Sequence, residues 1–398
     1  MSLNFEKLIK FDLLDRLEEN RRDYFYNRFI ALIDIIIEII TFDQFIKEIP
    51  SFPGSTDKII RSEMNMAIGS TLAIEGIHLN SDEIEESFRK SDANETLKRK
   101  EQEAQNSRNV YNFIIETVNT YKTRNEQIII TESLIKQIHK LFTENLNYVG
   151  NNPGDYRGDF TATFGSPRRE GLCKTRAEVE QAMKELVKWL NNEEANPRRP
   201  QIKAILAHYY LTEIHPFSDG NGRTARALEA LILYLNGINT YCFWSLANFW
   251  SANRDEYIAK LGQIRLTSDP FEFIEWGLNG YLVEIKRIKE RVLKKLKQLM
   301  LKDHVRYLLN NKNDEKIKIT RRIVSVMELL IDAGQPVPLS KFISSPQIKT
   351  LYKVPSTWYR DLKKMRTREL VTITSDKNGV EQIEPNFSIL DRITYNVR

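Results

Sequence analysis

The 398-residue chain contains very little cysteine: Cys173 and Cys242 are its only two, and they lie far apart in the sequence. Two distant cysteines exclude a disulfide framework and any zinc or iron–sulfur site made of several thiolates. Long apolar runs are also missing, because the most apolar stretch, 29–40, contains two carboxylates and is too short to cross a bilayer. Residues 1–7 lack the pattern of a signal peptide. These absences predict a soluble, cytoplasmic protein with no membrane partner.

Glycine and proline are scarce as well, with 16 and 13 residues. Long stretches without either carry apolar residues at three- and four-residue spacing, which predicts a mostly α-helical protein. Helices are expected at 13–49, 57–73, 81–121, 131–146, 176–191 and 201–214. Segment 148–171 is the exception, since it holds seven Gly and Pro residues. Alternation around 156–165 within it predicts a short β-hairpin.

Charge is distributed unevenly along the chain. The whole chain carries a net +5, but the part from Glu284 to the C-terminus has 25 Lys and Arg against 13 Asp and Glu. The preceding part is therefore mildly acidic. A basic tail section on an acidic body suggests two tasks or two partners. The alternative is that these basic residues only solvate exposed helices.

The last part of the chain predicts a small separate domain. Helices are expected at 319–333, 339–344 and 355–370, and two strands at 371–374 and 380–383 flank an Asn-Gly turn. Three helices followed by a hairpin is the order of a winged helix-turn-helix domain. The third helix is strongly basic, with Arg360, Lys363, Lys364, Arg366 and Arg368.

One segment, His215-Pro-Phe-Ser-Asp-Gly-Asn-Gly-Arg-Thr-Ala-Arg226, carries most of the chemical information. An apolar helix ends at His215, because the residue before a proline is disfavoured in the α region. A glycine-rich turn follows and feeds a new helix, whose first N–H groups can bind an anion. Arg223 and Arg226 lie three residues apart, so both can add charge-assisted bonds to phosphate oxygens.

Two further residues of this segment suit phosphate chemistry. Asp219 offers the hard oxygen ligand that Mg²⁺ prefers, and His215 can accept a proton near neutral pH. The combination predicts a nucleotidyl- or phosphoryl-transfer site. A dinucleotide-binding loop is excluded because a helix, not a strand, precedes the glycines. A calcium loop is excluded because its first and last ligand positions would be Phe217 and Leu228.

The segment matches the signature H-P-F-x-[DE]-G-N-G-R-x-x-R at all nine specified positions, and so resembles the Fic family of protein adenylyltransferases. The resemblance covers a helical core over about 131–282. Tyr156 and Arg157, just before the predicted hairpin, are similar to the start of the family's target-docking flap. The resemblance implies transfer of AMP from ATP to a Ser, Thr or Tyr hydroxyl of a target protein, with release of pyrophosphate.

The resemblance also implies a role for each residue of the signature. His215 would deprotonate the target hydroxyl, and Asp219 would hold Mg²⁺ between the ATP phosphates. The other ATP-binding residues would be Gly220, Asn221 and Gly222 at the α- and β-phosphates, Arg223 along the phosphate chain and Arg226 at the γ-phosphate. Tyr257 would contact adenine, although the family's usual second tyrosine is Ile258 here. Thr163, Phe164 and Gly165 would form the flap strand that holds the target.

An upstream stretch, Ser70-Thr-Leu-Ala-Ile-Glu75-Gly76, resembles the inhibitory-helix pattern [ST]-x-x-x-E-[GN] of Fic proteins. The resemblance implies that Glu75 pairs with an arginine of the same chain and restrains the enzyme. The alternative is an exposed helical glutamate before a C-terminal glycine. His208 is expected in the core, and His139 carries no functional signal.

These inferences divide the chain into an N-terminal helical region with the inhibitory helix (1–130), a Fic catalytic core (131–285), a helical linker (286–315) and a winged-helix domain (316–398). Several alternatives stay open at this stage. The same core can remove AMP or transfer another phosphate-containing group, and the signature does not specify the base. The chain can also be a DNA-binding regulator with a nucleotide-sensing core. The winged helix would bind either DNA or protein, and the chain can also form a homodimer.

Overall fold

The computed structural model describes residues 22–49, 55–124, 129–147, 150–160, 162–164, 169–192, 200–239, 246–267, 269–310 and 318–392. The chain divides into two compact units, Met1–Lys289 and Glu290–Arg398. No helix in the described part combines the length and apolar character needed to span a membrane. The four-part division made from the sequence stays a prediction.

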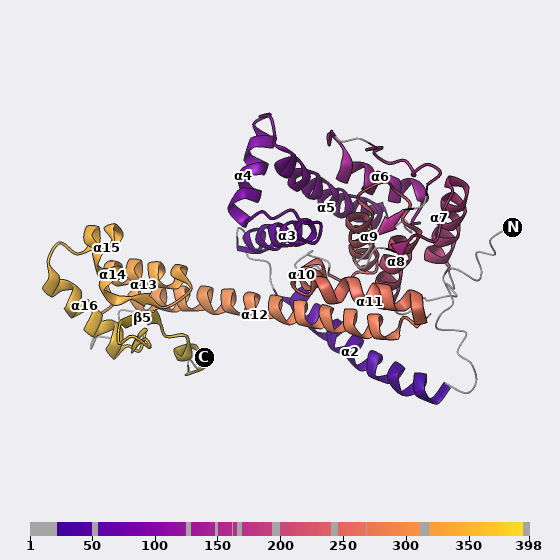
Figure 1. The fold of residues 1–398 in the computed structure, drawn as a ribbon. Coiled ribbons are helices and arrows are strands. Elements are labelled where there is room, and N and C mark those ends of the chain that lie inside the picture. The colour runs from indigo at the N-terminus through magenta and orange to yellow at the C-terminus, as the bar shows by residue number, and fades with distance from the viewer. Residues whose placement is uncertain are drawn as a thin grey trace. The chain divides into compact units, whose positions relative to one another are not determined.

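The first unit is built from helices (Figure 1). They are α2 (Arg22–Glu48), α3 (Ser55–Ile74), α4 (Ser81–Asp92), α5 (Arg99–Arg124), α6 (Glu132–Thr143), α7 (Arg176–Asn191), α8 (Pro200–Ile214), α9 (Asn221–Leu235), α10 (Leu246–Ala252), α11 (Arg254–Thr267) and α12 (Phe271–Asn310), which continues into the second unit. The prediction of a mostly helical protein is confirmed. Helix α8 packs chiefly on α9 and is buried on all sides, as expected of a central helix.

One expected helix, 81–121, proves to be two. Helix α4 ends at Asp92 and α5 begins at Arg99. Asn94 lies between them at φ +57°, a left-handed conformation that asparagine tolerates better than most residues. The N–H groups of Asn94 and Glu95 donate to the carbonyls of Ser91 and Lys90, closing the end of α4. The prediction of one helix was wrong because this turn leaves the apolar spacing on both sides almost unchanged.

A hairpin is present within 148–171, but it lies later in the chain than the alternation around 156–165 predicted, as β1 (Thr163–Phe164) and β2 (Arg169–Glu170). The strands are antiparallel, with Thr163 opposite Glu170 and Phe164 opposite Arg169. Helix α6 begins at the expected cap, since Thr131 accepts a hydrogen bond from the Leu134 N–H at 3.1 Å. Its end at Thr143 comes three residues earlier than predicted.

The second unit combines the end of α12 with short helices and a sheet. Its elements are α13 (Arg321–Ala333), β3 (Val337–Pro338), α14 (Leu339–Ser344), α15 (Pro346–Leu351), α16 (Pro355–Thr367), β4 (Val371–Ser375), β5 (Glu381–Pro385) and the 3-10 helix η2 (Phe387–Arg392). The antiparallel sheet has the order β3-β5-β4. The three predicted helices and the hairpin are all present, whereas β3 and α15 were missed because each is very short.

Candidate active site

The signature segment forms a loop between α8 and α9. His215 leaves α8 at φ +50°, and Gly220 caps α9 at φ +75°. A side chain on Gly220 would be strained by this backbone and would lie 3.3 Å from His139 and Thr143. Asn221 closes the loop, because its amide donates to the Phe217 carbonyl at 2.8 Å and accepts from the Phe217 N–H at 2.9 Å. The asparagine therefore fixes the loop backbone from inside.

His139 of α6 packs against this loop and supports it, a role that was not predicted from the sequence. Its ring is 2% exposed and stacks on Phe217 with 3.7 Å between ring centroids. Nδ1 accepts the Gly154 N–H at 3.0 Å, so Nε2 carries the proton and donates to the Asp219 carbonyl at 2.9 Å. Burial lowers the pKa of His139 to about 4, which keeps the ring neutral. In the sequence, His139 lies among the apolar positions Ile135, Ile138 and Phe142, and this position on the buried face of α6 could have indicated its structural role.

The candidate base, His215, is oriented by backbone carbonyls. Its Nδ1 lies 3.4 Å from the Thr212 carbonyl, which can only accept, so this contact places the proton on Nδ1. Nε2 then keeps its lone pair. Burial lowers the pKa of His215 to about 4, with the Arg157 charge acting in the same direction. At neutral pH the imidazole is therefore uncharged and able to take a proton.

Arg157 ties this loop to the residues around the hairpin. Its side chain is buried, and its Nε donates to the His215 carbonyl at 2.8 Å. Its other nitrogens donate to the carbonyls of Cys173, at 2.5 Å, and Phe160. The backbone N–H of Arg157 also donates to the Pro216 carbonyl at 2.9 Å. Arg157 thus fixes the carbonyl of the candidate base itself and the carbonyl of the proline that follows it.

Arg223 lies between two carboxylates. Its Nη1 is 3.0 Å from Glu103 of α5, and its Nη2 is 3.2 Å from Asp219. Glu103 is 2% exposed and also pairs with Arg99. Glu103 was not predicted from the sequence, although a carboxylate on the same helix face as Val110 and Ile114 is unusual and could have indicated a buried ion pair.

The Asp219 carboxylate is suited to a divalent cation. Its side chain is 46% exposed, and one oxygen accepts the Gly220 N–H at 2.7 Å. Within the described residues no group of three or more His, Cys, Asp or Glu side chains could hold a metal. Mg²⁺ commonly uses one or two carboxylates and takes its other ligands from phosphates and water. The residues present therefore fit an ion that arrives with a nucleotide.

Arg226 is engaged by the last turn of α3. Its Nη2 donates to Glu75 Oε1 at 2.6 Å and to the Thr71 carbonyl at 3.2 Å, and its Nε donates to the Thr71 hydroxyl at 2.8 Å. The guanidinium is 2% exposed, whereas the Glu75 side chain is 38% exposed. A Cβ on Gly222 would lie 2.8 Å from Glu75 Oε1. The carboxylate thus occupies the space directly beside Gly222, at the N-terminus of α9.

Comparison with known proteins agrees with this geometry. Residues 129–233 match the model of the Fic/DOC family. The chain carries a Fic domain. A protein adenylyltransferase, fic-1 of Caenorhabditis elegans, is 48% identical over 59 residues, which are 15% of this chain and 12% of that protein. Protein adenylyltransferase Fic of Drosophila grimshawi is 53% identical over 49 residues, 12% of this chain and 10% of that protein. The chain therefore spans only about a tenth of the length of these relatives.

Solved structures show the same fold. A Fic family protein from Desulfovibrio desulfuricans G20 is similar with a TM-score of 0.55 and 18% identity, over 89% of this chain and 95% of that one. A variant of Fic-1 from C. elegans is similar with a TM-score of 0.50 and 23% identity, over 65% of this chain and 71% of that one. At these identities the likeness establishes the fold alone.

Tyr257, the expected adenine contact, is buried in α11, beyond the residues that match the Fic/DOC model. Its hydroxyl lies 2.8 Å from His208 Nε2, and His208 Nδ1 lies 2.8 Å from Glu229. Burial raises the pKa of Tyr257 to about 12. His208 is fully buried, as expected, and the hydroxyl of Tyr257 is directed into the protein. A contact with a base would therefore use the ring of Tyr257 rather than its hydroxyl.

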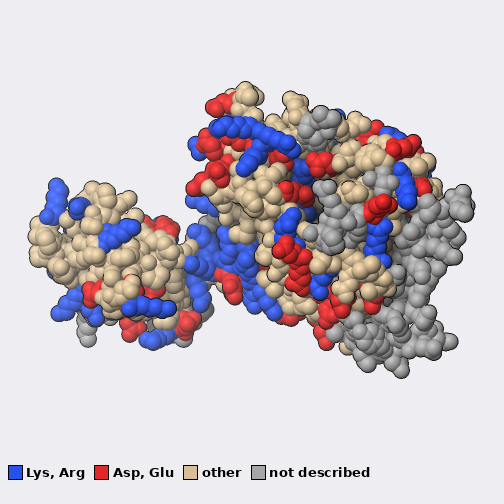
Figure 2. All heavy atoms as spheres, viewed as in Figure 1, with Lys and Arg blue, Asp and Glu red and all other residues tan. Residues whose placement is uncertain are grey.

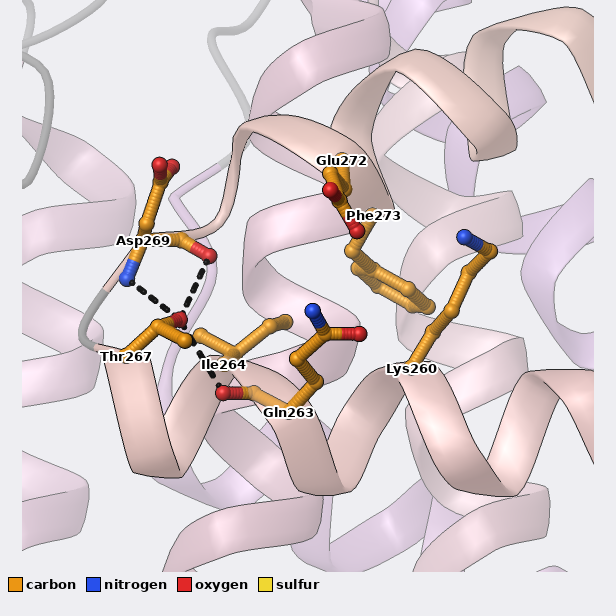
Figure 3. A pocket seen from close by; sticks show the side chains of 7 residues that line it. All are labelled: Lys260, Gln263, Ile264, Thr267, Asp269, Glu272 and Phe273. Atoms are coloured by element: carbon orange, nitrogen blue, oxygen red, sulfur yellow. Dashed lines mark hydrogen bonds between the residues drawn. The ribbon is translucent and has the colours of Figure 1, made fainter.

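The predicted flap residues lie only partly within the described structure. Thr163 is exposed in β1, next to Phe164, whereas Gly165 lies outside the described residues. A separate hollow opens between α11 and the start of α12 (Figure 3). Its lining consists of Lys260, Gln263, Ile264, Thr267, Asp269, Glu272 and Phe273. None of the signature residues lines it, so it is not part of the Fic loop.

Proposed function

We propose that the Fic domain transfers AMP from ATP to a Ser, Thr or Tyr hydroxyl of a target protein. In this step the hydroxyl oxygen forms a bond to the α-phosphorus while the bond to the bridging oxygen breaks and pyrophosphate leaves. The hydroxyl proton goes to His215. The observation that carries the proposal is the neutral imidazole beside a glycine-rich helix N-terminus that also presents Arg223 and Arg226.

The other parts of the loop support the same chemistry. Asp219 would hold Mg²⁺, which supplies charge neutralisation for the phosphates when it is bound. The first N–H groups of α9, with Gly220, Asn221 and Gly222, would face the α- and β-phosphates. These groups are already fixed by Asn221 and His139, so little reorganisation is needed at the moment of transfer.

The transferred group can be tested with position-specific label. The protein is incubated with Mg²⁺, target lysate and ATP labelled either on the α-phosphate or on the γ-phosphate. Adenylyl transfer labels protein from the α-position only, and intact mass then gives one added AMP. Label from the γ-position would contradict the proposal and indicate phosphoryl transfer. Parallel reactions with labelled UTP and GTP test the choice of base, and loss of label from a premodified protein tests AMP removal.

We further propose that Glu75 restrains this activity. Its carboxylate takes the guanidinium that the γ-phosphate would use, and it lies in the space beside Gly222 that the phosphate chain would approach. Like charges at such short range repel strongly, so a nucleotide could not adopt its productive position while Glu75 stays in place.

We also propose a second task for the second unit, as a winged helix that binds duplex DNA. Residues 290–398 contain 22 Lys and Arg against 12 Asp and Glu. Helix α16 packs inward through Trp358, Leu362 and Met365. On its exposed side lie Arg360, Lys363 and Arg366, for which no acidic partner is present among the described residues. A helix with a free basic face is the usual element for the DNA major groove.

The basic run of α12 contributes less to this proposal. Figure 2 shows many Lys and Arg side chains along α12. Within the second unit, however, Lys302 pairs with Asp332 at 2.6 Å and Arg306 with Glu328 at 2.5 Å, so these cations already have partners. These two cations are used in ion pairs within the second unit, so α16 is the better candidate for DNA binding.

Fluorescence anisotropy with a labelled duplex tests the second task. Affinity should fall steeply between 50 and 200 mM salt, as expected when phosphates are neutralised. Arg360→Ala with Lys363→Ala should weaken binding, whereas Lys302→Ala, which removes an already paired cation, is the matched control. Equal affinity of the double variant and wild type would contradict a role for α16.

A further inference from the structure

The last turn of α3 is held by two arginines from outside the helix. The final carbonyls of a helix lack partners within it. In α3, the Leu72 carbonyl accepts the N–H groups of Glu75 and Ile77, both at 3.0 Å, and the Ala73 carbonyl accepts that of Gly76. The Ile74 carbonyl accepts from Arg254 Nε at 2.9 Å. Arg226 takes the Thr71 carbonyl, so every carbonyl from Thr71 to Ile74 is engaged.

The bond from Arg254 bears directly on the Glu75 carboxylate. The Ile74 carbonyl and the Glu75 N–H belong to one planar peptide group. Fixing the carbonyl therefore fixes the orientation of the Glu75 backbone and the direction in which its side chain leaves. Gly76 follows at φ +83° and turns the chain away, so no further helical turn follows, and within α3 this peptide is held by the bond from the Glu75 N–H to the Leu72 carbonyl.

Arg254 links the start of α11 to the end of α3 through its bond to the Ile74 carbonyl. It is the first residue of α11, the helix that carries Tyr257 one turn later. Its side chain is 49% exposed, and its ionic contact with the exposed Asp255 is long, at 3.7 Å. A cation at a helix C-terminus is also favoured by the helix dipole. The interaction is therefore modest in strength and accessible from the surface, unlike the buried pair of Glu75 and Arg226.

We propose that Arg254 is a positioning residue for the inhibitory carboxylate, so that α11 latches the end of α3 and holds Glu75 against Arg226. This inference rests on the proposed restraint by Glu75. Loss of the Arg254 hydrogen bond leaves the Ile74–Glu75 peptide held by its N–H alone and does not remove the carboxylate. The restraint then weakens but does not vanish, and α11, which carries the candidate base contact, becomes a means of controlling it.

The test is a set of variants of the full-length chain, assayed for auto-modification with Mg²⁺ and labelled ATP. Arg254→Ala should raise auto-modification about threefold to tenfold over wild type, the effect of one ordinary hydrogen bond, because the half-exposed Arg254 side chain is largely solvated. Arg254→Lys can still donate to the carbonyl and should stay near wild type. Asp255→Ala removes the neighbouring charge and should also change nothing. In the Glu75→Gly background, Arg254→Ala should have no effect, because there is no carboxylate left to position.

Three results would overturn the inference. One is Arg254→Ala at the wild-type level while Glu75→Gly is strongly activated, which leaves the proposed function intact. Another is reduced activity of Arg254→Ala in the Glu75→Gly background, which would make Arg254 part of the catalytic machinery. The third is no label transfer by Glu75→Gly itself, which would remove the proposed function together with the latch. Hydrogen exchange supplies a readout without activity: the Glu75 and Ile77 amides should exchange faster in Arg254→Ala than in Asp255→Ala.

Discussion

Two histidines of the Fic domain, His139 and His215, differ in how deeply they are buried and in how their rings are held. His139 has both ring nitrogens in hydrogen bonds, to Gly154 and Asp219, and is locked under the loop. The Nδ1 of His215 lies 3.4 Å from the Thr212 carbonyl, and the side chain is more exposed than that of His139. Burial keeps both rings neutral at pH 7, and of the two His215 is the proposed base.

Replacing the candidate base should separate chemistry from binding. We expect His215→Ala to lose at least about a hundredfold in transfer rate, the usual contribution of a general base. ATP affinity should change little, because the phosphate contacts that we propose are the N-terminus of α9 and the two arginines rather than the imidazole. Transfer assays and calorimetric titration with Mg-ATP measure the two effects. Full transfer activity in this variant would rule out His215 as the base.

The lowered pKa of His215 predicts an unusual pH profile. A depressed pKa means that the base stays deprotonated until the pH falls through about 4. An ordinary histidine, with a pKa near 6.5, would lose about tenfold between pH 7.5 and 5.5. We expect kcat/KM for transfer by the Glu75→Gly variant to stay nearly constant over this range, since kcat/KM reports the free enzyme. A tenfold fall with a midpoint near 6.5 would contradict the assigned pKa.

Helix α3 is held in place by contacts with distant helices rather than by residues near it in the sequence. Its Glu63 is buried and pairs with Arg287 of α12 at 2.6 Å, while Thr71 and Glu75 contact Arg226 of α9. Breaking a buried pair leaves a charge without compensation, so Glu63 and Arg287 hold the helix firmly. We therefore expect the proposed restraint on the loop to be released most easily at the end of α3, where Glu75 is partly exposed.

Glu75→Gly should raise auto-modification strongly, because it frees Arg226 and the space beside Gly222. A misplacement of about 1 Å at a reacting group costs on the order of a hundredfold in rate, which sets the expected gain. Adding Arg226→Ala should remove most of that gain, since the γ-phosphate would then lack the guanidinium that we propose for it.

Asp57→Asn serves as the control, since it removes an exposed carboxylate from the first turn of the same helix. Label transfer from ATP is measured for all four proteins with target present. Glu75 would be an ordinary surface residue if its glycine variant matched wild type and the Asp57 control.

For the whole molecule, the two compact units predict where the chain can be shortened. No signature residue lies in Glu290–Arg398. A chain ending at Lys289 and carrying Glu75→Gly should fold and keep auto-modification, but lose DNA binding. A chain ending at residue 310 should be less soluble, because it keeps Leu301 and Val305, which belong to the apolar core of the second unit.

Circular dichroism, light scattering and label transfer compare the two truncated chains with the full-length variant. Loss of helical signal in the shorter chain would mean that the second unit is needed for folding of the first. Equal solubility of both truncations would mean that the exposed end of α12 finds cover elsewhere.

Much of the local structure followed from the sequence because it depends on near neighbours. His215 before a proline, the glycines of the loop and the apolar spacing around them placed α8, the loop and α9 within a residue or two. The Asn-Gly turn placed β4 and β5 in the same way. The break between α4 and α5 was not predicted, because one left-handed residue, Asn94, interrupts the helix without changing its apolar pattern.

The helical class and the signature loop could be predicted from the sequence, because periodicity, turn chemistry and helix ends are set by residues a few positions apart. Tertiary packing brings distant groups together around the loop and the end of α3: Glu103 at Arg223, His139 against Phe217, and Arg254 at the Ile74 carbonyl. These partners lie between about 80 and 180 residues apart along the chain. Their meeting depends on how whole helices pack, and close packing specifies contacts that no local pattern encodes.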